Sequence, residues 1–549
     1  MHEAVTEGYR RGDAPRRSAT VARRLIVSSA SLLAVLLTPS VDAHAQLPPS
    51  PLPLSNVEDA RTLEKGTILL RVLNAWTRFD DVYDATADSM HHLHPLGNAF
   101  SAESLGVRQF PALAAAQSAL RTLTQNPGLA LNLGQAFSTA DTRVVTTPLS
   151  LEYGVTGRLT IGVLVPIVQT HSTVFVELNP RRLNGNFGAN AGPNPALVDN
   201  TVLSINQGVV DQLGNAVQAL DSYLSSCNCS SAQATQLRDQ ASRFQAAVAA
   251  LYGSGQFAPL KASAEQTAIV NNLTALAAQI NTLLGSNYNF GTPVPANAAA
   301  ALLQLQQLAV SGAGLDSLGS PDRIGVGDVE VSARLKLHDA FADTTPGFRL
   351  RATLLGVLRL PTGRPPSGTV PFETGTGTGQ MSADAGAILD IRLAKRFMAT
   401  LAGEYTAYFT SANVARMPNS DYALFPLDLP IAGTWREGNA VQAEATPRFQ
   451  VTDYFTVHAA YAFRRQAAPQ YTSADVSAPP TFLATTEQRA GIGFAYSTVA
   501  RYAKARSTVP FEVSYTHLET LTASGGLVPK YSREQIEVRI YYRLRRGGR

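Results

Sequence analysis

The strongest pattern along the chain is an alternation of apolar and polar residues. From Asp328 to Leu337 every second residue is polar or charged, and each residue between them is apolar. The runs from Phe348 to Leu360 and from Ile536 to Leu544 repeat the pattern. An alternation with period two predicts strands that turn one face to apolar surroundings and the other to polar ones.

Twelve such runs can be placed, most of them close to the ~9–11 residues that a tilted strand needs to cross a bilayer. They lie at about 66–78, 143–155, 158–171, 325–338, 347–360, 380–392, 396–410, 438–451, 454–466, 485–498, 507–518 and 532–545. The connections after the second, sixth and eighth runs are short, and those after the fourth and tenth are moderate. The others are mostly longer, up to about 150 residues.

An even number of amphipathic strands with alternating short and long connections is typical of outer-membrane barrels. The pattern therefore predicts an all-β transmembrane barrel of about 12 antiparallel strands. Closure is expected because an open sheet edge in lipid would leave backbone groups without partners. The alternative is a secreted β-sandwich or propeller, whose loops show no such alternation in length.

Two hairpins orient the predicted barrel. The segments Glu152–Ile167 and Phe449–Phe463 each join two strands through a two-residue joint, at Thr156-Gly157 and at Thr452-Asp453. Such short joints are typical of periplasmic turns, whereas the longer loops face outward. The aromatic girdle on the periplasmic side is then expected to include Tyr153, Tyr454 and Phe455.

The connection at 172–324 changes from a period of two to a helical period of about 3.6. Its apolar stripes are Val210, Leu213, Val217, Leu220 and Leu224; Leu237, Phe244, Val248 and Leu251; Ile269, Leu273, Leu276, Ile280 and Leu283; and Leu302, Leu305 and Leu308. Asp199 and Ser230 are suitable N-caps, and Gly253, Gly285 and Gly312 are suitable stops. We expect a large α-helical insertion in one extracellular loop, packed as antiparallel hairpins.

The N-terminus has the features of an export signal. Six arginines between Arg10 and Arg24 precede an apolar run, Leu25–Leu37, and then small residues at Ala43 and Ala45. This order predicts a cleaved signal peptide rather than a membrane anchor, which needs ~20 apolar residues. The expected organisation is a signal peptide at 1–45, a Pro-rich periplasmic linker at 46–65, barrel strands at 66–171 and 325–549, and the helical insertion at 172–324.

Composition excludes several classes of function. The chain has 45 Lys+Arg against 41 Asp+Glu and a net charge of +4, too little to favour nucleic acid. Common nucleotide-binding, metalloprotease and nucleophile-elbow motifs are missing, and the Gly-rich Thr374–Gln380 looks like a flexible linker. His171 and Ser172 are adjacent and point to opposite faces of a strand. We therefore expect no enzyme activity and no cofactor.

Charged residues on the polar faces of the strands are candidates for the barrel lining. These are Glu330, Arg334, Lys336, Arg349, Arg351, Asp384, Asp390, Arg392, Glu404, Glu444, Arg489, Glu512, Glu537 and Arg539. They could border a narrow polar passage or form a salt-bridge network that plugs the barrel. Leu355 and Val357 share the face of Arg349, which favours a partly apolar solute.

Two further groups carry weaker hypotheses. Asp80, Asp81, Asp84 and Asp88 with His91, His92 and His94 could bind a divalent cation, among them Asp80, Asp84, His91 and His94 as candidate ligands. A solvated acidic loop explains the same residues, since their spacing fits no metal template. Cys227 and Cys229 form either a local turn clip or two thiols.

Three stretches, LEYGVTGRLTIGVLVPIV, RIGVGDVEVSARLKL and LLGVLRLPTG, are similar to hairpins of Gram-negative outer-membrane transporter-like barrels. The group associated with meta-pathway phenol degradation is the nearest in sequence character. The resemblance covers about 143–171 and 325–410 and implies passage of small, aromatic or hydrophobic compounds. The helical insertion and the C-terminal RRGGR, where such barrels usually end on an aromatic residue, depart from that pattern.

The expected function is passive or facilitated passage of small solutes through the outer membrane of a Gram-negative-type bacterium. The expected partners are the bilayer, the barrel-assembly machinery and a small-molecule solute. The alternative is a closed barrel that anchors the helical insertion for binding or adhesion. The strand register predicts that Leu354→Arg, facing lipid, costs ~2–4 kcal/mol if it lies near the midplane, whereas Thr353→Arg, facing the lumen, costs little.

Overall fold

The computed structural model describes residues 59–83, 93–179, 185–194, 197–226, 231–303, 305–307, 319–341, 347–367, 369–370, 372–416, 430–474, 483–505, 509–525 and 528–543. The predicted signal peptide, the linker up to residue 58, both cysteines, and Asp84 and His91 lie outside these ranges.

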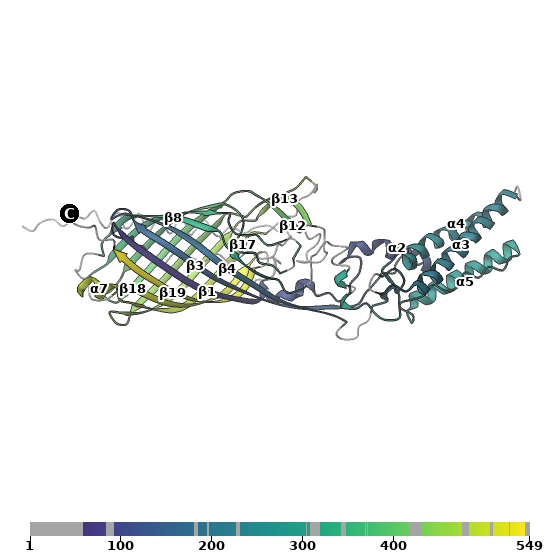
Figure 1. Cartoon of the computed structure of the whole chain (residues 1–549), viewed down its shortest axis with the longest axis horizontal. Coiled ribbons are helices and arrows are strands. Elements are labelled where there is room, and N and C mark those ends of the chain that lie inside the picture. The colour runs from purple at the N-terminus through teal and green to yellow at the C-terminus, as the bar shows by residue number, and fades with distance from the viewer. Residues whose placement is uncertain are drawn as a thin grey trace, which may run out of the picture. The chain divides into compact units, whose positions relative to one another are not determined.

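Twelve antiparallel strands form a closed barrel (Figure 1). Neighbours pair in the order β1, β3, β4, β8, β9, β10, β11, β14, β15, β17, β18, β19, and β19 pairs with β1 to close the ring. The bounds are β1 Thr67–Tyr83, β3 Ala136–Gly154, β4 Leu159–Leu178, β8 Val329–Asp339, β9 Arg349–Leu360, β10 Ser382–Arg392, β11 Phe397–Tyr408, β14 Ala440–Gln450, β15 Phe455–Gln466, β17 Thr485–Ser497, β18 Phe511–Ser524 and β19 Val528–Arg543. Each predicted run overlaps one strand, so the predicted barrel is confirmed.

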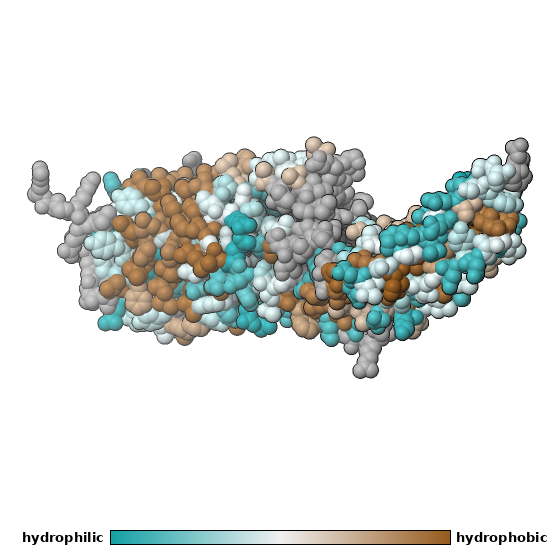
Figure 2. Space-filling model, turned by 45° about the vertical axis from the view of Figure 1, so that its right-hand side comes forward, coloured by the Kyte–Doolittle hydropathy of each residue, from teal (hydrophilic) through white to brown (hydrophobic). Residues whose placement is uncertain are grey.

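The outer face of the barrel carries a belt of exposed apolar side chains (Figure 2). The belt includes Leu70, Val72, Leu149, Leu151, Ile161, Val163, Val331, Leu335, Leu354, Leu358, Leu401, Val457, Ile492 and Ile540. These residues alternate along their strands with residues that face the interior. A continuous apolar surface of this extent is unfavourable in water, and it is the surface that a barrel presents to lipid.

Aromatic side chains gather at the end of the barrel that carries the tight turns. Tyr454 lies 6.3 Å from Tyr496, and Phe455 lies 5.9 Å from Phe494, measured between ring centroids. Tyr153 is exposed next to its turn. The aromatic residues therefore lie where the two hairpin joints predict a girdle, and the assignment of this end to the periplasm stays a prediction.

The lengths of the connections follow the predicted alternation with one exception. Tight turns at 155–158, 393–396 and 451–454 lie at one end, and most long connections lie at the other. The connection between β18 and β19 was expected to be long, but β18 ends at Ser524 and β19 begins at Val528, at the end with the long connections. The two strands are longer than their alternation indicated: residues 519–524 extend β18 along β17, and residues 528–531 extend β19 along β1.

The four long helices, α2 to α5, come from two connections instead of one. Helix α2, Ala114–Thr124, belongs to the β1–β3 connection, whereas α3, Asn200–Ser226, α4, Ala232–Val248, a π-helical turn at Ala249–Gly253, and α5, Ala264–Leu284, belong to the β4–β7 connection. Helix α2 packs against α4 and α5. The first three predicted stripes match α3, α4 and α5. Near Leu302 and Leu305 the described residues hold only short helical pieces.

Hydrogen bonds join the two connections into one helical domain. Asn272 Nδ2 donates to Leu123 O at 2.9 Å, and Asn132 N donates to Asn186 Oδ1 at 2.8 Å. Leu120 and Leu123 of α2 share a buried core with Leu213, Phe244 and Ile269 of the other helices. The domain therefore has a core that neither connection could complete alone.

Short elements complete the fold. They are β2 Leu93–Pro95, β5 Phe187–Ala189, β6 Phe257–Pro259, β7 Asp322–Val326, β12 Ser411–Arg416, β13 Pro430–Arg436, β16 Gln470–Thr472, α7 Val499–Ala505, and 3₁₀ turns at Leu96–Phe100 and Pro111–Leu113. Strand β7 runs along β4 ahead of β8. Among the described residues, no helix has the length and apolar character that crossing a membrane would require.

Candidate functional site: the barrel lumen

The predicted lining residues lie on inward-facing strand positions. They alternate with the exposed apolar belt on β8, β9, β10, β11, β14, β17, β18 and β19. The set is Glu330, Arg334, Lys336, Arg349, Arg351, Asp384, Arg392, Glu404, Glu444, Arg489, Glu512 and Arg539, together with Asp390 and Glu537. Several are deeply buried, with Asp390 1%, Arg489 4% and Asp384 5% exposed. These three side chains are therefore covered by neighbouring side chains.

One polar cluster lies toward the end of the barrel with the long connections and is organised by Arg359. Its Nε donates to Glu330 Oε1 at 2.9 Å, and its Nη2 lies 3.1 Å from Asp384 Oδ2. Its Nη1 also donates to Ser382 Oγ at 3.1 Å. A guanidinium has five donors in a fixed fork, so one side chain can hold three strands in register.

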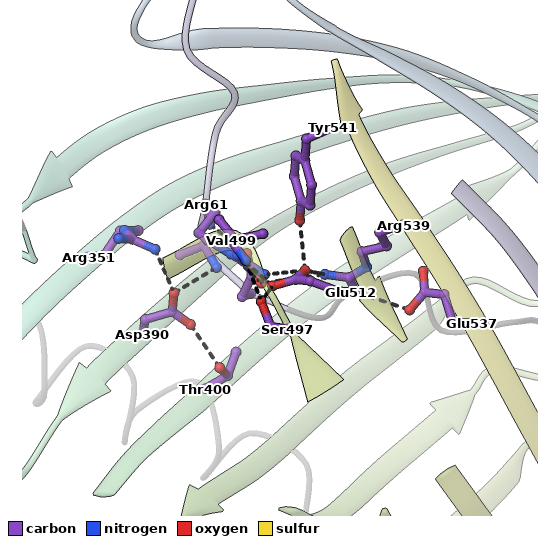
Figure 3. Close-up of polar contacts among 12 residues, drawn as sticks. Arg61, Arg351, Asp390, Thr400, Ser497, Val499, Glu512, Glu537, Arg539 and Tyr541 are labelled. Carbon is purple, nitrogen blue, oxygen red and sulfur yellow. Dashed lines mark hydrogen bonds and ion pairs between the residues drawn. The ribbon is translucent and has the colours of Figure 1, made fainter. Parts of the chain in front are cut away.

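A second cluster lies toward the tight-turn end, around Glu512 (Figure 3). Tyr541 Oη donates to Glu512 Oε2 at 2.7 Å, and Arg539 lies 3.5 Å from the same oxygen. Arg539 also pairs with Glu537 at 3.1 Å, and Glu537 pairs with Arg71 on β1. Because β1 and β19 form the closing pair, this network joins the two sides of the seam.

Residues 59–65, which we call the strap, precede β1 without joining the sheet, and Asp59, Ala60 and Arg61 lie inside the barrel. Arg61 donates to both oxygens of Glu512, from Nη1 at 3.1 Å and from Nη2 at 3.0 Å. Ala60 N donates to Asp390 Oδ2 at 3.1 Å, and Thr353 Oγ1 donates to Ala60 O at 2.7 Å. Figure 3 shows Arg61 between Glu512 on one side and Asp390 on the other.

The strap crosses the lumen from wall to wall. Glu512 lies on β18 and Thr353 on β9, and these strands are six steps apart in the ring of twelve (β18, β17, β15, β14, β11, β10, β9). They are therefore on opposite sides of the barrel. Ala60 is fully buried and Asp59 is 5% exposed.

Ala60 of the strap rests on a small apolar patch inside the barrel. Ala60 packs with Leu355 and Ile388, which are 8% and 1% exposed, and Val357 and Ala402 border them. Leu355 and Val357 are the inward apolar residues that the sequence pattern indicated. Most other inward positions near the strap are charged or hydroxylated, so the patch is the apolar part of this level.

A second segment, the connection 361–381 between β9 and β10, folds against the inner face of β4 and β7. We call it the inner loop. Ser172 Oγ donates to Phe372 O at 2.8 Å, and Arg323 on β7 pairs with the buried Glu373. Asp328 accepts from Gly363 N at 2.8 Å and from Thr378 N at 2.7 Å.

Glycines let the inner loop pack closely. Gly375 has a φ of +68°, and a Cβ there would lie 2.5 Å from Arg364 O, so no other residue fits. Thr374 and Gln380 are 2% and 1% exposed. The interpretation of Thr374–Gln380 as a flexible linker was therefore wrong: its glycines serve tight packing.

The candidate cation ligands are not brought together in the described residues. Asp80 is exposed on β1, and His94 lies on β2 opposite Val82. No group of three or more His, Cys, Asp or Glu side chains suited to a metal occurs within the described ranges. Since Asp84 and His91 lie outside these ranges, the metal site stays a prediction.

The sequence pattern missed several residues of the lumen. Four inward-facing residues were not among the candidates, although the alternation of their strands places them on the polar face: Arg71, Glu152, Arg359 and Arg533. Asp59 and Arg61 could not be found in this way, because they precede the first strand and were assigned to the linker 46–65. Their position depends on long-range pairing with β9, β10 and β18.

No protein-family model and no curated protein sequence matches the chain. Similar solved structures include an outer membrane channel from Pseudomonas putida F1, with 10% identity, a TM-score of 0.39, and coverage of 89% of this chain and 100% of that one. A FadL homologue from Pseudomonas aeruginosa has 10% identity and a TM-score of 0.25, covering 87% and 91%. The translocator domain of the autotransporter NalP from Neisseria meningitidis has 7% identity and a TM-score of 0.28, covering 96% and 97%. Similarity at this level carries no inference about what this barrel conducts or binds.

Proposed function

We propose that the chain is exported by its signal peptide, is inserted by the barrel-assembly machinery, and forms an outer-membrane channel for small solutes. The apolar belt and the aromatic girdle support the membrane location. The mixed charges on the inner wall support a polar route rather than a lipid-filled interior.

The strap is the main structural support for a channel function. It is not part of the sheet, and it is held to the walls by hydrogen bonds, an ion pair and the packing of Ala60 on the apolar patch. A wall strand could not leave without opening the barrel, whereas the strap can move and leave all twelve strands paired. A lumen closed by such a segment is suited to conditional opening.

Small aromatic or hydrophobic solutes are the class that this interior favours. The patch of Leu355, Ile388, Val357 and Ala402 offers apolar contact in a lining that is otherwise polar. An apolar solute gains about 25 cal/mol for each Å² that it buries there. Strongly charged solutes would instead have to compete with ion pairs that are already formed, such as Arg359 with Asp384.

Solute flux into proteoliposomes tests the proposal. The full chain should pass small neutral solutes, and Arg61→Ala should raise the flux several-fold, because it removes the two-pronged contact with Glu512. Arg158→Ala is the matched control, since Arg158 is exposed at a tight turn of the same end. Absence of flux from both the wild-type chain and Arg61→Ala would contradict a channel.

A surface anchor is the second candidate, favoured by the helical domain. Its helices come from two connections and share one buried core. To separate the two functions, both connections, residues 96–133 and 180–318, should be replaced together by short linkers. Removing only the second would expose the apolar face of α2. Flux should persist if the barrel is the working part, and cell-surface binding should be lost if the helices are.

A further inference from the structure

The strap occupies a place in the lumen where three kinds of contact meet. The Ala60 methyl group lies against Leu355 and Ile388, its N–H donates to Asp390, and its carbonyl accepts from Thr353. Thr353 and Asp390 are each 1% exposed, so both polar groups are withdrawn from bulk solvent. This is the arrangement of a ligand site: apolar walls with a few well-placed polar groups.

We propose that this place is a solute subsite, filled by Ala60 in the closed barrel and by solute when the strap withdraws. The proposal rests on the channel function and names the class of solute. We call the group of Thr353, Leu355, Ile388 and Asp390 the Ala60 subsite. The solute has a compact apolar body and carries a hydroxyl or amide that both donates and accepts a hydrogen bond.

The polar groups require a solute that replaces both hydrogen bonds of Ala60. When the strap leaves, Thr353 loses its acceptor and Asp390 loses a donor. A buried polar group without a partner costs about 1–3 kcal/mol. A single hydroxyl can donate to Asp390 and accept from Thr353, and an amide can do the same with two atoms. A pure hydrocarbon can do neither.

The charges around Asp390 select against charged solutes. The carboxylate already accepts from Thr400 Oγ1 at 2.8 Å and lies 3.5 Å from Arg351 Nη1. An anion would be placed against this carboxylate. A cation would meet Arg351 close to the same oxygen. A neutral solute avoids both repulsions and keeps the apolar contacts.

Binding of four related probes tests the subsite: benzyl alcohol, toluene, benzoate and benzylamine, measured by equilibrium dialysis with the full chain. In Arg61→Ala, where the strap is loosened, benzyl alcohol should bind more tightly than in the wild-type chain and more tightly than the other three. Adding Thr353→Val should weaken its binding roughly fivefold, the value of one hydrogen bond. Thr353→Ser should restore the binding.

Thr520→Val is the matched control, because Thr520 is a buried inward threonine on β18, across the ring from Thr353. It should leave binding of benzyl alcohol unchanged. Equal binding of toluene and benzyl alcohol, tightest binding of benzylamine, or no effect of Thr353→Val would overturn the subsite. Binding in the expected order without flux would support the subsite and contradict the channel, whereas flux without this order would overturn the subsite alone.

Discussion

Thr353 and Ala60 are 293 positions apart in the chain, yet the hydroxyl of Thr353 donates a 2.7 Å hydrogen bond to the carbonyl of Ala60 inside the barrel. The bond fixes a segment that precedes the first strand onto the wall opposite its ion pair with Glu512. Thr353 is therefore an anchoring residue of the strap, and an arginine there would not be as harmless as the strand register alone suggested.

Substitutions at 353 and 354 should separate the two faces of β9. Leu354→Arg places a charge in the apolar belt and should cost ~2–4 kcal/mol near the midplane, read from the free energy of unfolding in lipid vesicles. Thr353→Arg should cost less in stability but should displace the strap and raise solute flux. Similar losses of stability without increased flux at 353 would contradict the inward placement of its side chain.

The ion pair between Arg61 and Glu512 should be restored by exchanging its charges. Glu512→Arg alone should raise flux, because the introduced guanidinium would repel the guanidinium of Arg61 and push the strap away from β18. The double variant Arg61→Glu with Glu512→Arg should bring flux back toward the wild-type level. Arg539 adjoins Glu512 and Glu537, so incomplete restoration is expected. Flux in the double variant as high as in Glu512→Arg would contradict a direct pair.

Asp328 should control the order of the inner loop. Its carboxylate accepts from Gly363 N, Thr378 N and Thr378 Oγ1, so Asp328→Ala leaves three donors without their partner. Each hydrogen bond to a charged group is worth about 1.5–3 kcal/mol. We expect proteolysis within 361–381 in intact cells to become faster. Asp322→Ala, an exposed acid on β7, is the control and should leave proteolysis unchanged.

Alkaline pH should unfold the helical domain through Tyr252. Burial raises the pKa of Tyr252, whose hydroxyl donates to Gln266 Oε1 at 2.5 Å. A raised pKa in the folded state means that the stability is complete below the unfolded pKa of about 10 and falls as pH rises above it. The helical circular-dichroism signal should therefore decline above about pH 10, and less steeply in Tyr252→Phe. Identical pH profiles for the two proteins would assign the decline to other groups.

Helix α2 should behave as part of the helical domain rather than of the barrel. Leu123 is fully buried among α2, α4 and α5, so Leu123→Ala should lower the stability of the domain by about 2–5 kcal/mol. Susceptibility of α3 and α4 to protease should increase, although these helices belong to a different connection. Unchanged protection of α3 and α4 would contradict a shared core.

The barrel could be predicted from sequence because its signal is local. The alternation at Asp328–Leu337 predicts both the strand and the face to which each side chain points. Strands that follow each other in the sequence also mostly pair with each other. The helical stripes of α3, α4 and α5 are local in the same way. Helix α2 was missed because its apolar positions are few, and its partners are α4 and α5, more than a hundred residues later.

The lumen was predictable only in part, for a physical reason. Residues such as Arg351 and Glu512 occupy the polar positions of the alternating pattern, so the sequence predicts that their side chains face the lumen. It does not predict which side chains they pair with there. The strap has no periodicity, and Asp59 and Arg61 look like ordinary polar linker residues. Their burial follows from complementary charges and an apolar patch that exist only once the ring has closed.

The strap also has a mechanical consequence. It ties β18, beside the seam where the first and last strands meet, to β9 and β10 across the ring. A barrel wall one sheet thick resists flattening poorly. A segment such as the strap, tied to opposite walls near one end, makes that end harder to deform into an oval. Withdrawing the strap should therefore soften this rim of the barrel as well as unblock it, so that lateral pressure in the membrane and the state of the passage become linked.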